Sequence, residues 1–359
     1  ASGHLSLLDN RFVVTTRTGH VTAAQGGRVD ISGTSFEIPN VQIKRAPARV
    51  RLKTSSTITA VLSLLNEEPF RFLDKAGQLV TLADGRAALG GTLDFLLIKD
   101  LQPEEVAFDV TGRLEDVRSE TLVPGRVLNA AALDVRATKE DLVVSGDGRI
   151  GQVPFNGRFR AELAPDSGGQ SDVRGWIEIS ERFADEFRIG LPPGSLTGAG
   201  RGQIEIDFEK GAPGAFRLTS TLAGVGLRLP QLGWSLSPGA TGELEVSGRL
   251  GEPPSLDRVR IAAGGLSARG TVALRPDGQL DRASFTRVQV GDWIDAPVEL
   301  VGRGAGAVPL VRVLGGSIDL RQTSLAGGGD NAAQGRRNAG GPVSLILDRL
   351  QISEGIALT

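Results

Sequence analysis

Apolar and polar residues alternate with a period of two along most of this chain. Residues 204–209 read IEIDFE, residues 243–250 read ELEVSGRL and residues 106–110 read VAFDV. Residues 153–163, VPFNGRFRAEL, carry apolar or small side chains at every odd position. Because successive side chains of a β-strand point to opposite faces, the pattern predicts strands with one apolar face and one solvated face.

Turn signals separate these strands. Asp84-Gly85, Asp147-Gly148 and Asp277-Gly278 predict hairpin turns, because Asp and Gly tolerate positive φ. The strand-turn-strand pattern recurs every ~10 to 15 residues, as in an antiparallel meander of roughly two dozen strands. At ~4.8 Å per strand such a sheet would run about 115 Å, so it must curl or split.

Helical patterns are few. Ile58, Val61, Leu62 and Leu65 have the spacing of one face of a short helix. A second short helix is expected between Ser180, a favoured N-cap residue type, and Gly190. The predicted fold class is therefore all-β: a long curled antiparallel sheet with one or two short helices.

An internal echo indicates two related β units. Residues 108–114, FDVTGRL, resemble residues 244–250, LEVSGRL, although any two glycine-rich strands can look alike. We expect one unit over about 1–175 and the other over about 176–324. Residues 325–342 are expected to be a flexible Gly-rich insertion, and residues 343–359 the start of a further, truncated β unit. The chain contains no Met, so we expect it to be a piece of a longer protein.

Composition excludes several classes of function. The net charge of −2 gives no field that attracts nucleic acid. No Cys is present, which excludes disulfides and thiolate metal sites. Aromatic residues make up only 4% of the chain and Tyr is absent, so the apolar faces are mainly aliphatic. No uncharged stretch is long enough to span a bilayer as a helix.

No catalytic motif stands out, and we expect no catalytic residue, metal or cofactor. His4 and His20 have no partner motif and are interpreted as solvated turn residues. Residues 146–151, GDGRIG, match the GxGxxG pattern, but a strand-like segment with a proline follows where a dinucleotide site needs a helix. The segment is interpreted as a hairpin turn. A glycosidase with two distant carboxylates is the enzyme alternative, although the chain has few aromatic platforms for sugars.

Several stretches carry a resemblance to a family. Residues 49–53 lead into a leucine-rich run that ends before a Pro-aromatic pair, and residues 345–350 continue a strand after the Gly-rich insertion. Residues 227–234 contain an LP-x-LGW segment, and residues 315–321 a G-x-S-x-D-L-R strand end. Together they resemble the AsmA-like envelope proteins of the YhdP and TamB type. The likeness runs from about Phe12 to Leu358, and its motifs are loose because they are structural.

The resemblance implies a repeating β-groove, a taco-like sheet with an apolar inner face along which phospholipids slide between two membranes. It also implies a place in the periplasm of a Gram-negative bacterium, with the parent protein anchored in the inner membrane. Phospholipids would be the ligand, both membranes would be reached through other regions of the parent protein, and envelope proteins would be possible partners. The larger inward residues predicted to line the groove are Phe108, Val110, Phe155, Phe159, Ile204, Ile206, Phe208, Leu218, Val246 and Leu274.

A different reading of the same pattern stays open. A sheet with one apolar face and few helices must bury that face, and it can do so against a second sheet instead of lipid. The chain would then be a non-transporting β-scaffold or an assembly factor for outer-membrane proteins. The sequence does not separate this reading from the groove, because strand pairing is not given by the pattern.

Overall fold

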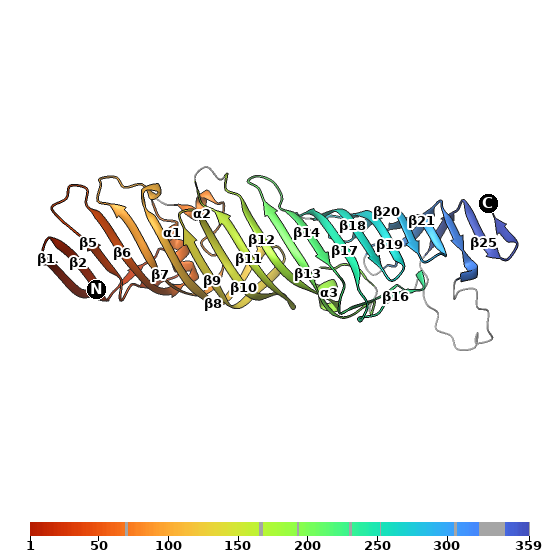
Figure 1. The fold of residues 1–359 in the computed structure, drawn as a ribbon, viewed down its shortest axis with the longest axis horizontal. Helices are drawn as coiled ribbons and strands as arrows, with labels where there is room; N and C mark the ends of the chain where they lie inside the picture. The colour runs from red at the N-terminus through yellow and green to blue at the C-terminus, as the bar shows by residue number, and fades with distance from the viewer. Residues whose placement is uncertain are drawn as a thin grey trace. The chain divides into compact units, whose positions relative to one another are not determined.

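The predicted all-β class is confirmed by a computed structural model, which describes residues 1–68, 71–164, 168–191, 194–229, 232–251, 253–304, 307–322 and 342–358. Among the described residues, strands account for 62% and helices for 7%. The chain divides into two compact units, Ala1–Gly175 and Trp176–Thr359. Figure 1 follows the strands in chain order. Whether the two units are related copies, as the echo suggests, stays a prediction.

The first unit is built from long antiparallel strands and two short helices. Helices α1 (Ile58–Leu65) and α2 (Phe72–Lys75) both lie between β6 and β7, and the 3-10 turn η1 (Pro103–Glu105) precedes β8. The strands are β1 (Ser2–Leu8), β2 (Arg11–Thr18), β3 (His20–Thr22), β4 (Arg28–Asp30), β5 (Ser35–Ile38), β6 (Pro47–Thr57), β7 (Asp84–Leu96), β8 (Ala107–Val123), β9 (Arg126–Thr138), β10 (Asp141–Ile150) and β11 (Val153–Glu162).

Strand β12 (Ser171–Ser180) leads into the second unit, where helix α3 (Glu181–Glu186) and the 3-10 turn η3 (Leu320–Gln322) join the strands. Its other strands are β13 (Leu196–Phe208), β14 (Ala215–Ser220), β15 (Val225–Leu229), β16 (Trp234–Leu236), β17 (Gly242–Arg249), β18 (Ser255–Ala263), β19 (Leu266–Leu274), β20 (Leu280–Val290), β21 (Ile294–Val301), β22 (Leu310–Leu314), β23 (Ser317–Asp319), β24 (Val343–Ile346), β25 (Arg349–Ser353) and β26 (Ile356–Leu358). Residues 325–341 and Thr359 lie outside the described residues, so the predicted insertion is not tested.

Strand register places the alternating apolar residues on one face. In the first unit Phe108 on β8 lies opposite Leu93 on β7, which lies opposite Val50 on β6. Directly opposed residues of antiparallel strands lie on the same face, so the three side chains form one cross-strand row. The apolar face of each unit is continuous in this sense from strand to strand.

The other face carries charged cross-strand pairs. Glu37 on β5 pairs with Arg11 on β2 at 2.8 Å and with Arg51 on β6 at 3.2 Å. In the second unit Glu299 on β21 likewise pairs with Arg282 at 2.7 Å and with Arg312 at 3.4 Å. These Arg-Glu-Arg bridges each span three strands and favour one register.

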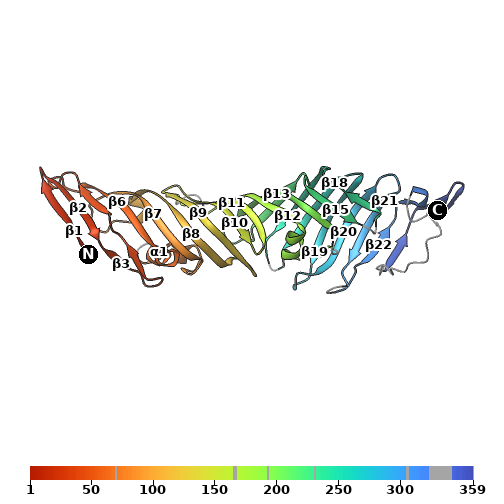
Figure 2. The ribbon, with the colours of Figure 1, turned by 90° about the horizontal axis from the view of Figure 1, so that it is seen from below.

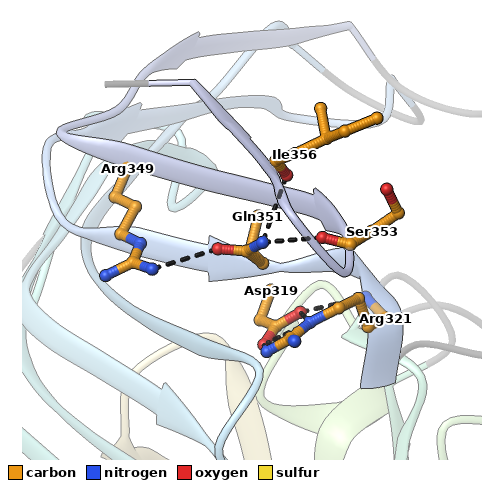
Figure 3. A network of polar contacts seen from close by, with 6 residues as sticks. All are labelled: Asp319, Arg321, Arg349, Gln351, Ser353 and Ile356. Atoms are coloured by element: carbon orange, nitrogen blue, oxygen red, sulfur yellow. Dashed lines mark hydrogen bonds and ion pairs between the residues drawn. The ribbon is translucent and has the colours of Figure 1, made fainter.

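The antiparallel meander changes near the C-terminal end of the second unit. Strands β22 and β24 pair in parallel, and so do β23 and β25. Asp348 joins the two pairs, since its carboxylate accepts a hydrogen bond from the backbone N–H of Gly316 at 2.6 Å. Figure 3 shows polar contacts that follow, including the two hydrogen bonds at 2.9 and 2.6 Å that Arg321 donates to Asp319. The strands that the sequence predicted after the insertion are therefore present.

Both predicted helices are confirmed, and α2 was missed. The α1 helix begins after Thr57, whose side-chain oxygen accepts a hydrogen bond from the backbone N–H of Ala60 at 3.1 Å. Helix α3 begins after Ser180, which lies in extended conformation as an N-cap does, although its side chain makes no capping bond. The four-residue α2 is too short to leave a periodic pattern in the sequence.

Two predicted hairpin turns are wrong and one is confirmed. Asp277-Gly278 does join β19 to β20, and Gly278 has a φ of +80°. Asp147-Gly148 instead lies inside β10. Gly148 has Phe155 of β11 as its neighbour, and a Cβ on Gly148 would come within 2.7 Å of the Phe155 ring. Asp84-Gly85 begins β7, and the preceding connection holds α1 and α2 instead of a tight turn.

The GxGxxG segment and the histidines also differ from expectation in their local structure. Residues 146–150 belong to β10, and the turn follows at Gly151, whose φ is +55°. His4 lies in β1 and His20 in β3, so neither is a turn residue, although both are exposed as expected. Because residues 146–150 form a strand, the GxGxxG segment has no helix N-terminus that could receive a pyrophosphate.

Candidate functional site: the apolar face of each unit

The apolar face of the first unit is mostly half-buried. Next to the row of Phe108 and Leu93 lies a second row, in which Val110 lies opposite Gly91 on β7 and Ala137 on β9. On β11, Phe159 lies opposite Val144 of β10. Phe108, Val110 and Phe159 are each partly exposed. The apolar side chains of this face therefore keep some contact with solvent in the folded chain.

The ten predicted groove residues all lie in strands, and register places them on the apolar face. Ile204, Leu218 and Val246 are direct cross-strand neighbours on β13, β14 and β17. Leu218 is buried, with 8% of its surface exposed. The others are half-buried, namely Phe108, Val110, Phe155, Phe159, Ile204, Ile206, Phe208, Val246 and Leu274. Whether any of them contacts lipid is not tested.

The sequence missed many members of the same face. Register adds Leu93, Val135 and Val144 in the first unit and Phe216 and Phe285 in the second. Their alternation was visible, but assigning them to one surface requires the pairing of strands that are distant in sequence. A shift of one residue in register would have reversed every assignment.

Glycines let the strands approach closely on this face. Gly91 lies opposite Val110, and a Cβ at Gly91 would collide with the backbone oxygen of Asp109. The adjacent Gly90, on the other face, has only an ordinary contact at 3.5 Å. The apolar face therefore requires glycine at position 91 where the charged face does not.

Insertions cover one end of the strands in each unit. In the first unit the connections 19–34 and 58–83 both open from the strand ends where β6 finishes and β7 begins. In the second unit the connections 181–195 and 221–241 open from the ends where β14 finishes and β17 begins. We call these ends the insertion rim of each unit, and the opposite strand ends its loop rim.

The insertion of the first unit is held by a small apolar cluster. Ile58 of α1 packs with Ala87 and Val117 of the sheet, and α1 lies beside β6 and β7 (Figure 2). Ala60 of α1 is fully buried against Ala23 and Val29 of the other insertion. These insertions thus cover the apolar face near the insertion rim, and Ala48 at the opposite end of β6 is also buried.

The insertion of the second unit makes a larger core. Strands β15 and β16 bring Trp234 and Leu236 onto the ends of β19 to β21, where Leu266, Val290 and Ile294 are buried. The Trp234 indole N–H donates a hydrogen bond to the backbone oxygen of Gly264 at 2.8 Å. The chain's own insertion therefore covers the part of the second unit's apolar face that lies at the insertion rim.

On the charged face, ion pairs shift the pKa of several carboxyls. The Arg11 guanidinium holds the pKa of the Glu37 carboxyl below its ordinary value, chiefly through their hydrogen bond. Hydrogen bonds from Arg160 and Arg287 likewise lower the pKa of Asp141 and of Asp295. Each of these carboxyls is paired with an arginine of a neighbouring strand, as in a structural ion pair.

Polar and charged side chains were compared across the part of the chain that the structure describes for groups that could bind a metal ion or form an acid/base pair. No group of three His, Cys, Asp or Glu side chains there could hold a metal ion, and no buried side-chain polar atom lacks a partner. A hollow of about 410 Å³ on the charged face places Arg201 over the Trp176 ring at 4.3 Å, beside Glu178. Glu178 is engaged there by Arg182 at 2.6 Å, so the hollow offers no free acid/base pair.

No family model, no curated protein and no solved structure matches this chain. The resemblance to AsmA-like envelope proteins therefore stays a prediction from the sequence. Among the helices of the described residues, none has the length and apolar character needed to cross a membrane.

Proposed function

We propose that the apolar faces bind the acyl chains of phospholipids, and that the chain is a segment of a periplasmic bridge between the inner and outer membranes of a Gram-negative envelope. The observation that carries the proposal is a cross-strand apolar face that stays half-buried. In the first unit, Phe108, Val110 and Phe159 keep solvent contact although α1 covers the neighbouring insertion rim.

The chemistry of the face favours acyl chains over a specific small ligand. A specific pocket places a few polar groups among apolar walls to fix the orientation of its ligand. The cross-strand row of Val50, Leu93 and Phe108 contains no polar side chain. The neighbouring row with Val110 and Ala137 contains none either. A featureless aliphatic wall suits a chain that slides and needs no fixed register.

The second candidate is a scaffold without transported lipid, such as an assembly factor for outer-membrane proteins. It is favoured by the second unit, where Trp234 and Leu236 fill part of the apolar face from within the chain. The two functions differ in what occupies the rest of that face. The parent protein's membrane anchor and its envelope partners belong to the same proposal and lie beyond these residues.

Binding of a fluorescent fatty acid to the full chain tests the proposal. Ile206→Asp places a charge on the apolar face of β13, and we expect it to weaken binding at least tenfold. Gln203→Asp adds the same charge to the exposed face of the same strand and is expected to leave binding unchanged. Circular dichroism and unfolding curves establish that both variants fold. Equal binding by both folded variants, or no binding by the unmodified chain, would favour the scaffold.

A further inference from the structure

Three arginines lie directly opposite one another on the charged face of the second unit. Arg260 on β18 is the register partner of Arg269 on β19, and Arg269 is in turn the register partner of Arg287 on β20. All three side chains are exposed, whereas the adjacent Ala268 and Val288 are buried in the core of the other face. We call these three residues the arginine row. Like charges in directly opposed positions repel each other and destabilise the pairing of their strands.

The first unit treats directly opposed charges differently. Arg49 on β6 has a carboxylate, that of Asp94, as its register partner on β7, and the two side chains pair at 2.6 Å. Asp141 and Glu162 are an acidic pair in direct opposition, but Arg160 lies 2.9 Å from the first carboxylate and 3.7 Å from the second. The chain itself thus supplies the counter-ion for this like-charged pair.

The arginine row is neutralised by the chain mainly at one end. Arg287 donates two hydrogen bonds to the Asp295 carboxylate, at 2.7 and 2.6 Å. At the other end, Arg260 has Glu245 as its register partner on β17. Glu245 also lies 3.8 Å from Arg217 on β14, so its charge is shared.

Arg269, in the middle of the arginine row, has no counter-ion of its own. Within the part of the chain that the structure describes, no ion pair or hydrogen bond includes its guanidinium group. Glu243 lies 3.6 Å from Arg260, too far for a hydrogen bond, and its side chain is exposed. Asp257 and Arg258, at the nearby bulge of β18, add one charge of each sign. The row therefore lacks an anion beside Arg269.

We propose that the arginine row of β18, β19 and β20 binds a phosphate group, either free or as an ester in a lipid head group. Because the three residues are direct cross-strand neighbours, their long side chains can reach one ligand. A carboxylate has two oxygens in one plane, which suit a single guanidinium fork, whereas a phosphate offers three or more oxygens to neighbouring forks. The site lies on the charged face, so it does not depend on the proposed binding of acyl chains to the apolar face.

Isothermal titration calorimetry of the full chain with inorganic phosphate and with glycerol 3-phosphate, at constant ionic strength, tests the site. Glycerol 3-phosphate carries the phosphate ester of a lipid head group but no acyl chain, so the apolar face cannot account for its binding. Arg269→Gln removes the central charge, and we expect it to weaken binding about tenfold or more, as for the loss of a charged hydrogen bond. Arg228→Gln, the control, removes an exposed arginine whose register partner is Ser235, and should leave binding unchanged.

Binding that only Arg269→Gln weakens would support the site, and the tighter of the two compounds would distinguish a free phosphate from an ester. No binding of either compound by the unmodified chain, or an equal loss in both variants, would overturn it. Acetate that binds as tightly as phosphate would overturn the preference for phosphate.

Thermal unfolding in phosphate-free buffer at low salt is a second readout. Arg269→Gln relieves the repulsion within the arginine row, so the melting temperature of the second unit should rise by up to about 4 °C. Added phosphate should raise the melting temperature of the unmodified chain more than that of this variant. A melting temperature that Arg269→Gln lowers would overturn the premise that the row lacks an anion.

Discussion

Each of the two units has a charged face with an Arg-Glu-Arg bridge, but the units differ in how their apolar faces are covered. Glu37 in the first unit and Glu299 in the second each bridge two arginines across three strands. The buried cluster of the second unit includes Trp234, Leu236 and the ends of β19 to β21. That of the first unit is small and lies around Ile58. One alternating pattern thus produces a face that the chain's own insertion partly closes in the second unit and a face that stays mostly half-buried in the first.

The difference traces to the connections and not to the strands. Strands of both units alternate in the same way, and an insertion of each unit contains short β-strands, but only the second unit's insertion, residues 221–241, carries a tryptophan. A buried aromatic side chain contributes more to a core than the alanines that dominate the first unit's clusters. Stability should therefore be concentrated in the second unit's insertion, and ligand binding in the first unit's open face.

The largest effect is expected from Trp234→Ala. Removing a buried aromatic side chain should lower the free energy of unfolding of the second unit by about 3–5 kcal/mol. Hydrogen exchange should quicken in β15, β16 and the ends of β19 to β21, and not in the first unit. Trp176→Ala, which removes only a stack with Arg201 on the charged face, is the control and should cost less than about 1 kcal/mol. Equal losses in urea unfolding would contradict the assigned core.

A smaller effect is expected from Gly91→Ala in the first unit. Its Cβ has no room beside Asp109, so the strands must shift, at about 1–3 kcal/mol. Gly90→Ala, one residue away on the other face, should be neutral or stabilise the unit by up to about 1 kcal/mol. Urea unfolding of the two variants compares the faces directly. A Gly90→Ala variant as unstable as Gly91→Ala would show that strand conformation, and not close approach, requires the glycines.

The smallest effect on stability is expected from a change on the charged face, where both units have an Arg-Glu-Arg bridge. The folded pKa of Glu37 lies below its ordinary value of 4.5, so its contribution to stability is present above that pH. The contribution is lost as pH falls through the folded pKa. Glu37→Gln should therefore lower the melting temperature at pH 7, and the difference from the unmodified chain should shrink below pH 4.5. A difference that stays constant down to pH 2 would show that the ionised pair with Arg11 is not its source.

The sequence predicted the strands and two helices well because their signals are local. Residues 204–209 form part of β13, and the spacing from Ile58 to Leu65 matches α1 from end to end. Asp147-Gly148 misled because a glycine can also make room for a ring on the next strand, as it does for Phe155. Local sequence does not distinguish these two uses of glycine.

The pairing of strands could not be predicted from the sequence. Strand β14 pairs with β17 and not with the next strand in the chain, and β22 pairs in parallel with β24 across a long connection. Such choices depend on contacts between distant segments. The candidate lining residues could therefore be placed on one face of each strand, but the cover that Trp234 and Leu236 provide could not be foreseen.

Native mass spectrometry of the full chain, incubated with a single phospholipid and compared with the Val110→Asp and Thr111→Asp variants, tests the central claim most directly. These positions are neighbours on β8, one on the apolar face and one on the charged face. Acyl binding predicts mass increments in whole multiples of the lipid for the unmodified chain and for Thr111→Asp, with fewer lipids on a folded Val110→Asp variant. A single lipid-free mass for the folded unmodified chain would contradict it.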